Sequence, residues 1–174
     1  MIIRTTIIFL FMISVLLSGI REEAEFMVQA EFGDEATLVF SRYIIPKDIK
    51  QKVEHKAKQR FYSDFVYTWS VTIDSKIVGY ALLDNVKGKS MPITFISMYN
   101  NHGEVVNAAV VKYREPIGGE VERKPWLKQF FGRNSASQYD DIDGISGATI
   151  SVDSMTKGIQ KLTLLLSLIR DDLS

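Results

Sequence analysis

The chain has 174 residues, of which 46% are hydrophobic and 24% are charged, a composition that excludes intrinsic disorder and is sufficient for one globular domain with a core. Lys and Arg (21) balance Asp and Glu (21), so no overall basic charge is available to bind a nucleic acid. The absence of cysteine excludes disulfides, thiolate zinc sites and iron–sulfur clusters, and two histidines leave little for a histidine metal site. We therefore expect no nucleic-acid partner and no metal site, and any chemistry must come from an organic cofactor or from carboxylate and hydroxyl groups.

The first twenty residues are typical of an export segment. Arg4 precedes an apolar run from Ile7 to Leu17, and charges return abruptly at Arg21. This pattern predicts either a secretory signal peptide or an uncleaved membrane anchor, because the stretch from Ile2 to Ile20 is almost long enough to span a bilayer.

Cleavage of this segment stays open on the sequence. A small-x-small site at Val28, Gln29 and Ala30 lies far from the apolar run. On either alternative, we expect a folded domain over residues 31–174 that lies outside the cytoplasm, in the periplasm or on the outer face of the cytoplasmic membrane.

Residues 46–61 are predicted to form an amphipathic helix. Apolar side chains recur at every fourth position, at Ile49, Val53, Ala57 and Phe61. Six Lys and Arg residues against two acidic ones make the outer face basic. This face is either merely solvated or a contact for anionic lipid or for an acidic redox partner.

Four strand patterns follow, rich in β-branched and aromatic residues and separated by short turns. They cover residues 65–73, 76–83, 92–99 and 104–113 and predict two hairpins. A short helix is predicted around residues 125–132 and a final helix over residues 151–169. We therefore predict an α+β fold, a single domain with a mainly antiparallel curved sheet flanked by an N-terminal and a C-terminal helix.

The run DGISGAT, from Asp143 to Thr149, lies just ahead of the final predicted helix. Gly147 is free to adopt a backbone conformation closed to other residues, and Ser146 and Thr149 supply hydroxyls where free backbone N–H groups are expected. This arrangement is typical of a helix cap and also of an anion-binding site.

The order of several such blocks resembles a known family. The export segment, the strand VGYA (Val78–Ala81), the run VVKYREPIGGE, the segment WLKQFFG and the run DGISGATIS are similar to the FMN-binding domain family. That family is found in the flavin-bearing subunits of Rnf-type complexes and of the sodium-translocating NADH:quinone oxidoreductase. The resemblance extends over roughly Ile77 to Lys161.

The resemblance implies which residues bind the cofactor. The run from Asp143 to Thr149 is similar to the Dxx(S/T)GAT motif that a flavin transferase reads before it joins FMN, through the phosphate, to the threonine hydroxyl. Thr149 is then the residue that carries covalent FMN. The remaining implied cofactor-binding residues are Ser146, Gly147, Ala148, Asp143, Glu115, Pro116, Gly118, Gly119 and Trp126.

Three of these assignments carry alternatives. Asp143 serves either in recognition by the transferase or as a turn residue that bonds its own backbone. Pro116 stands where a threonine is common in the family, which removes one hydroxyl contact. Trp126 belongs to the core or stacks on the flavin ring. Beside them, Arg114 either faces the electron-rich end of the reduced ring or pairs with a surface acid.

The function that follows is an extracytoplasmic, membrane-associated electron carrier rather than a stand-alone enzyme, because no set of acid and base residues suggests a catalytic site. We expect a flavin transferase as its maturation partner and membrane-bound proteins as redox partners. The alternative is a non-catalytic extracytoplasmic module, sensory or structural, that binds flavin without passing electrons.

Overall fold

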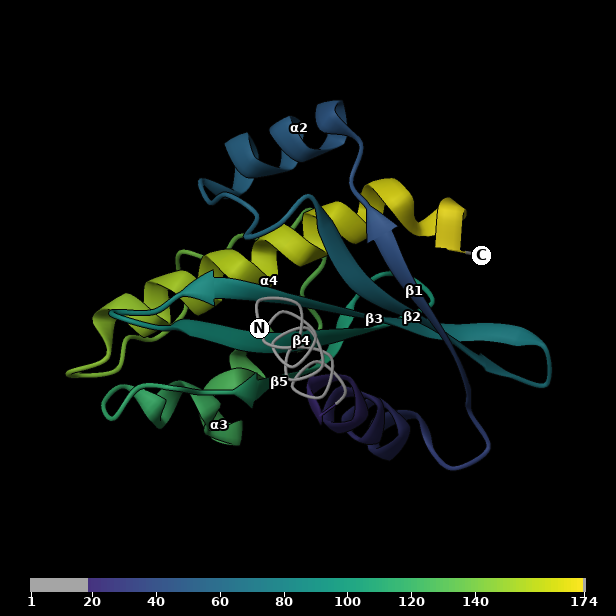
Figure 1. The fold of residues 1–174 in the computed structure, drawn as a ribbon, viewed down its shortest axis with the longest axis horizontal. Coiled ribbons are helices and arrows are strands. Elements are labelled where there is room, and N and C mark those ends of the chain that lie inside the picture. Colours follow the sequence, from purple (N-terminus) through teal and green to yellow (C-terminus); the bar gives the residue numbers. More distant parts are fainter. Residues whose placement is uncertain (1–18, 174) are drawn as a thin grey trace, which may run out of the picture.

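A five-stranded antiparallel sheet forms the centre of the structure, a computed structural model that describes residues 19–173 (Figure 1). The strands follow chain order across the sheet, and each is antiparallel to the next. They are β1 (Thr37–Ile44), β2 (Phe65–Ile73), β3 (Lys76–Lys87), β4 (Pro92–Asn100) and β5 (Val105–Lys112). The predicted α+β class and antiparallel sheet are confirmed.

Both predicted hairpins are present, and their turns have clear local causes. Asp74 and Ser75 adopt positive φ angles of 50° and 61°, which match the two-residue turns that suit twisted strands. In the turn between β4 and β5, the Asn100 side-chain oxygen accepts the backbone N–H groups of His102 and Glu104. Gly103 completes this turn with a φ of 82°.

Two elements of the structure were not predicted. Strand β1 pairs with β2 along its whole length, and a helix covers residues 19–32. Consequently α2 (Lys47–Ala57) follows β1 in the chain, and the sheet begins one strand earlier than the sequence pattern indicated.

The helix α4 (Thr149–Ile169) covers one face of the sheet and contributes seven of the 26 buried residues of the core on that side. Its Gly158 lies so close to the sheet that an added Cβ would stand 2.6 Å from Val86 Cγ1. One turn further on, the fully buried Lys161 Nζ lies 2.9 Å from the Asp84 carboxylate on β3. A tight approach and a buried ion pair therefore fix the position of α4 on the sheet.

Short helical turns and α2 complete this side of the molecule. In Figure 1, α2 stacks on α4 at the top, away from the sheet. The segment between β5 and α4 forms η1 (Gly119–Glu122), α3 (Lys124–Leu127) and η2 (Lys128–Phe130), and η3 (Arg170–Leu173) follows α4. The predicted short helix around residues 125–132 is therefore two consecutive turns of different type.

The helix of residues 19–32, purple in Figure 1, covers the opposite face of the sheet. Its fully buried Ala24 and Val28 pack in a second core with Trp69 and Met98. The Glu25 carboxylate accepts the indole N–H of Trp69 at 3.1 Å. The folded part thus includes residues ahead of position 31, where the domain was predicted to begin, and the small-x-small site lies within this packed helix.

The predicted export segment, residues 1–20, lies outside the described residues except for its last two. Within residues 19–173, no helix combines the length and the hydropathy that crossing a membrane requires.

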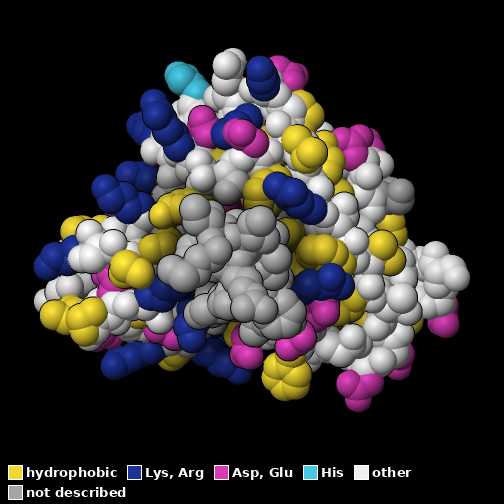
Figure 2. Space-filling model, viewed as in Figure 1, with side chains coloured by type: hydrophobic (Ala, Val, Ile, Leu, Met, Phe, Trp, Pro, Cys, Tyr) yellow, Lys and Arg dark blue, Asp and Glu magenta, His cyan; other side chains and the backbone are white. Residues whose placement is uncertain are grey.

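The predicted basic face of α2 is exposed to solvent. Lys47, Lys52, His55 and Lys56 are all exposed on this helix, whereas Val53 is buried against α4. Figure 2 shows dark blue Lys and Arg side chains at the top of the molecule, over α2, with magenta acidic side chains among them. A lipid or redox partner for this face stays a prediction.

Replacement of Val28 by alanine tests whether the helix of residues 19–32 belongs to the folded domain. Loss of two buried methyl groups should lower the free energy of unfolding by about 2–3 kcal/mol. Phe26→Ala is the matched control on the same helix, because Phe26 is 71% exposed and its loss should change stability by no more than about 0.5 kcal/mol. Urea unfolding of the detergent-solubilised chain measures both, and equal small effects would show that the helix does not support the core.

Candidate functional site

An open cleft of about 350 Å³ lies where three loops meet at one end of the sheet. The loops are the turn between β3 and β4, the segment that follows β5, and the segment that leads into α4. The residues that line it are Lys89, Ser90, Glu115, Pro116, Ile117, Gly118, Gly147, Ala148, Thr149, Ile150 and Ser151. The cleft therefore joins the two sequence blocks that were predicted to form the site.

The N-terminus of α4 opens into this cleft. The first backbone bond of the helix runs from the Val152 N–H to the Ala148 carbonyl at 2.9 Å, so the N–H groups of Thr149, Ile150 and Ser151 have no partner within the helix. No side chain caps this end, and no acidic residue lies in the first turn. Free N–H groups and the positive end of the helix dipole together make a binding position for an anion.

A turn at Gly147 determines which hydroxyl reaches the cleft. Gly147 has a φ of 81°, and the Ala148 N–H donates to the Ile145 carbonyl at 3.0 Å. Ala148 is buried, which leaves Thr149 as the first residue of the helix with an exposed side chain. The left-handed conformation expected at Gly147 is therefore present and positions Thr149.

A partly buried hydroxyl pair joins the segment after β5 to the first turn of α4. The Tyr113 hydroxyl donates to the Ile117 carbonyl at 2.7 Å and lies 3.1 Å from the Ser151 hydroxyl. Burial raises the pKa of Tyr113, so its hydroxyl stays protonated and available as a donor. Ser151 is only 3% exposed, and its oxygen is therefore engaged in holding the cleft together.

Gly118 is required in this wall for two reasons. Its φ of 92° lies in the region that favours glycine, and an added Cβ would stand 2.6 Å from the Tyr113 hydroxyl and 3.0 Å from Ser151 Oγ. The predicted importance of this glycine thus has a steric cause, namely the space that the Tyr113 hydroxyl occupies.

Glu115 organises the opposite wall rather than pointing a free charge at a ligand. Its Oε1 accepts the backbone N–H groups of Ser90 at 2.6 Å and of Met91 at 2.8 Å. These bonds hold the pKa of Glu115 below its ordinary value. The negative charge is thereby compensated by the turn that it holds, and Lys89 adds a cation to the same cleft.

Four of the predicted residues lie outside the cleft. Trp126 is 7% exposed, packs against Phe130 and donates its indole N–H to the Asp143 carbonyl at 2.8 Å, so it supports the loop from below. Gly119 begins η1, and Ser146 is exposed in the turn ahead of Gly147. Stacking of Trp126 on a flavin stays a prediction.

The carboxylate of Asp143 is exposed, and it makes no hydrogen bond to any residue in the range 19–173. The bond to its own backbone, one of its two predicted roles, is therefore absent. Its backbone is fixed instead, because its N–H donates to the Gln129 side chain at 2.8 Å.

Within residues 19–173, Arg114 does not pair with a surface acid, which was one of its two predicted roles, and a role facing the flavin ring stays a prediction. Its guanidinium donates to the Pro92 carbonyl and to the Thr94 hydroxyl, both at 3.0 Å, and so secures the start of β4. The Pro92 carbonyl and the Thr94 hydroxyl at the start of β4 give the guanidinium acceptors close to its own loop, which explains its position.

Sequence reasoning assigned no role to several residues that build the cleft. Lys89 lines the cleft, and Tyr113 holds its wall through hydrogen bonds to Ile117 and Ser151. Ile117 and Ile150 are large apolar side chains in the lining that are 70% and 50% exposed. In the sequence, Ile117 directly before Gly118 and Gly119 is a pattern that could have pointed to an apolar ligand surface.

This arrangement fits a phosphorylated planar cofactor. The helix N-terminus and Lys89 suit a phosphate, Thr149 offers an exposed hydroxyl beside them, and the two isoleucines give a ring an apolar surface. No group of three His, Asp or Glu side chains within residues 19–173 is placed to hold a metal ion.

Comparison with known protein families agrees with this geometry. Residues 88–163, which include all the residues lining the cleft, match the family model of the FMN-binding domain. The chain therefore contains an FMN-binding domain, which confirms the predicted resemblance. It is a flavin-binding protein with FMN as its cofactor. A comparison with curated proteins gave no match.

Replacement of Gly118 by alanine should destabilise the cleft. The left-handed backbone costs a residue with a Cβ about 1–2 kcal/mol, and the Tyr113 hydroxyl must also move. Gly144→Ala is the control, because Gly144 has open space around it and should change the free energy of unfolding by no more than about 0.5 kcal/mol. Equal stabilities of the two variants in urea unfolding would contradict this role.

Acidification should release the turn that Glu115 holds. Because the pKa of Glu115 is lowered in the folded protein, the stabilisation from its carboxylate is present above the ordinary glutamate pKa of about 4.3 and is lost as the pH falls through the lower folded value. The amide resonances of Ser90 and Met91 should therefore titrate with a midpoint below about 4.3 in NMR spectra. Glu115→Gln should abolish this titration, and a midpoint at or above the ordinary value would be inconsistent with the proposed bonds.

Proposed function

We propose that this protein is an extracytoplasmic flavoprotein electron carrier in which FMN is attached through a phosphoester to Thr149. The observation that carries the proposal is the exposed Thr149 hydroxyl at the uncapped start of α4, inside a cleft with an apolar edge. A resident FMN would supply the capacity to accept and donate electrons.

The choice of Thr149 rests on a comparison of three neighbouring hydroxyls. Ser151 is buried and bonded to Tyr113, and Ser146 does not line the cleft. Thr149 is exposed and lines the cleft beside the free N–H groups. As the bond between Thr149 Oγ1 and phosphorus forms, the O–H bond of the threonine and one P–O bond of the phosphate break. Counted from free protein and free FMN, the departing proton and phosphate hydroxyl together make one water, so the product is lighter by that water.

The helix N-terminus would stabilise the product of this attachment. A phosphodiester carries one negative charge, and an anion at this position gains about 0.3–1 kcal/mol from the helix dipole. Covalent attachment also prevents loss by dilution: even a Kd of about 1 nM would empty the site where free FMN is scarce.

Electron transfer rather than catalysis fits the titratable groups of the cleft. Its one carboxylate within residues 19–173 is Glu115, which is bonded to backbone N–H groups and is thus unsuited to moving protons on a substrate. The exposed apolar edge at Ile117 and Ile150 leaves a bound ring open to a second protein.

The location rests on the export pattern of the first twenty residues. Arg4 precedes the apolar run from Ile7 to Leu17, an order typical of a segment that directs the following domain out of the cytoplasm. A flavin transferase would then mature the protein in that compartment, and membrane-bound redox proteins would exchange electrons with it.

Thr149→Val tests the linkage. The full chain, expressed together with a flavin transferase, should gain the mass of FMN less one water, and the valine variant should gain nothing because it has no hydroxyl. Thr156→Val is the matched control: it makes the same change on the same helix but does not line the cleft, so it should keep the full gain. Intact-protein mass spectrometry measures all three, and an unchanged gain in Thr149→Val would contradict attachment at this residue.

Reductive titration of the matured protein tests the carrier role. Reversible reduction, followed by reoxidation by an added acceptor protein, is expected of a carrier. A flavin that accepts electrons but passes none to any protein acceptor would favour the alternative of a sensory or structural module.

A further inference from the structure

The second face of the sheet carries an aromatic strip beyond the start of the helix of residues 19–32. The strip consists of Phe40 and Arg42 on β1 and Phe65 and Tyr67 on β2. Arg42 lies opposite Tyr67 in the strand register, and Ile44 lies opposite Phe65, so these side chains share one face. The rings of Phe40 and Phe65 lie 5.6 Å and 5.3 Å from that of Tyr67.

Two arginines cover the outer rings of this strip. The guanidinium carbon of Arg21 lies 4.0 Å from the centre of the Phe40 ring, and that of Arg42 lies 3.8 Å from the centre of the Phe65 ring. Ile44, at the end of the strip, is 71% exposed. Aromatic rings, arginine and exposed aliphatic groups in one surface have the mixed character of the boundary between lipid tails and headgroups.

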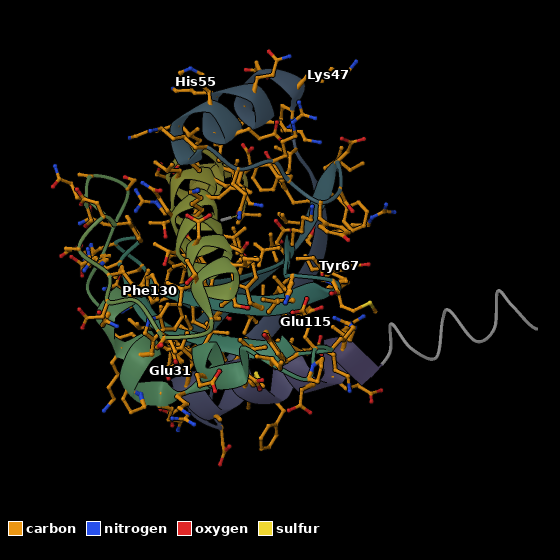
Figure 3. All side chains as sticks on the ribbon, turned by 90° about the vertical axis from the view of Figure 1, so that its left-hand side faces the viewer. Glu31, Lys47, His55, Tyr67, Glu115 and Phe130 are labelled. Carbon is orange, nitrogen blue, oxygen red and sulfur yellow. The ribbon has the colours of Figure 1, made fainter. Side chains whose placement is uncertain are left out.

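The chain enters the described structure at this strip. A groove of about 550 Å³ is lined by Ile20, Phe40, Tyr67 and Leu83 among others. The acidic Glu22 and Glu25 also line it, and the Glu25 carboxylate accepts hydrogen bonds from Arg21 and Trp69, which compensate its charge. Figure 3 shows Tyr67 on the side of the molecule on which the purple helix begins.

The sequence ahead of this point indicates that the strip faces a lipid bilayer. From Ile2 to Ile20, only Arg4 is charged. The helix of residues 19–32 is fixed on the sheet, since Ala24 and Val28 are fully buried, and its Ile20 lies beside the strip. Insertion of the preceding apolar segment in a bilayer would therefore bring the strip close to the bilayer surface.

We propose that the aromatic strip is a surface by which the protein lies on a lipid bilayer, adjoining an N-terminal segment that stays attached and inserted. The proposal rests on the membrane association in the proposed function, but it needs no bound flavin. Removal of the N-terminal segment at Ala30 would contradict it, because that cleavage would also remove the helix that packs on Trp69.

The absence of cysteine allows a direct test by single spin labels. A label at Ile44→Cys reports on the strip. Val39→Cys is the matched control, because Val39 lies on the same strand, is 56% exposed and points to the opposite face. His102→Cys, in an exposed turn at the other end of the sheet, is a second control.

The full-length variants are reconstituted in vesicles of phosphatidylethanolamine and phosphatidylglycerol. Electron paramagnetic resonance then compares the access of oxygen, which concentrates in lipid, with that of a water-soluble nickel chelate. We expect the oxygen-to-nickel ratio at Ile44 to exceed that at both controls several-fold. A ratio equal to the controls would overturn the proposal, and so would loss of access to both reagents at Ile44, which would indicate a protein contact instead.

The same measurement on the Thr149→Val background separates this proposal from the flavin attachment. The label at Ile44 should report the same environment with and without flavin. A missing flavin with a lipid-facing label would contradict only the attachment, whereas a normal mass gain with a water-exposed label would contradict only the membrane surface.

Discussion

The buried ion pair between Asp84 and Lys161 fixes the element on which the cofactor site depends. Burial raises the pKa of Asp84, and the ammonium of Lys161 opposes that shift. Lys161 also donates to the Arg60 carbonyl at 3.0 Å, so its position leaves little freedom. Such a pair adds little net stability, but loss of one partner strands a buried charge, at a cost of about 3–5 kcal/mol. It therefore selects one register of α4 on the sheet, and Thr149, twelve residues earlier, is placed about 18 Å away along the helix axis.

The N-terminus of α4 is held by a much smaller contact. The Tyr113 hydroxyl links the segment after β5 to Ser151, and Gly118 makes room for it. The ion pair thus sets where the free N–H groups of α4 lie, and the hydroxyl pair sets which loop faces them. A binding site made of backbone groups requires both, because backbone groups have no rotamers with which to adapt.

Much of the fold was predictable because the local sequence signals for turns, strands and helix starts agree with the structure that forms. The Asp74–Ser75 turn, the alternation in β2 and the glycine before α4 each indicate one structure, and the structure has them. The helix of residues 19–32 escaped prediction because it directly continues an apolar export pattern and buries only a narrow stripe around Ala24 and Val28. Strand β1 escaped prediction because its alternation is broken by Arg42, which packs on Phe65 instead of facing water freely.

In the site too, the local features were predictable from sequence and the long-range contacts were not. The residue types of the motif that ends at Thr149 could be assigned from sequence, since a helix start and a glycine turn are local features. Pairs such as Tyr113 with Ser151, 38 residues apart, depend on the packing of α4 against the sheet. Roles of Glu115 and Arg114 were also hidden, because a backbone partner can be any residue type and therefore leaves no mark on the sequence.

The topology places the two proposed surfaces at the same end of the strands. There β1 ends and β2 begins beside the aromatic strip, and β3, β4 and β5 contribute the loops of the cleft. A carrier tethered through this end would meet membrane-bound partners at the high effective concentration that a tether gives, without a strong contact to any of them. Weak contacts suit electron transfer, since a carrier must leave each partner after every exchange. The exposed isoleucines at the edge of the cleft are consistent with such brief encounters, and a buried cofactor would not permit them.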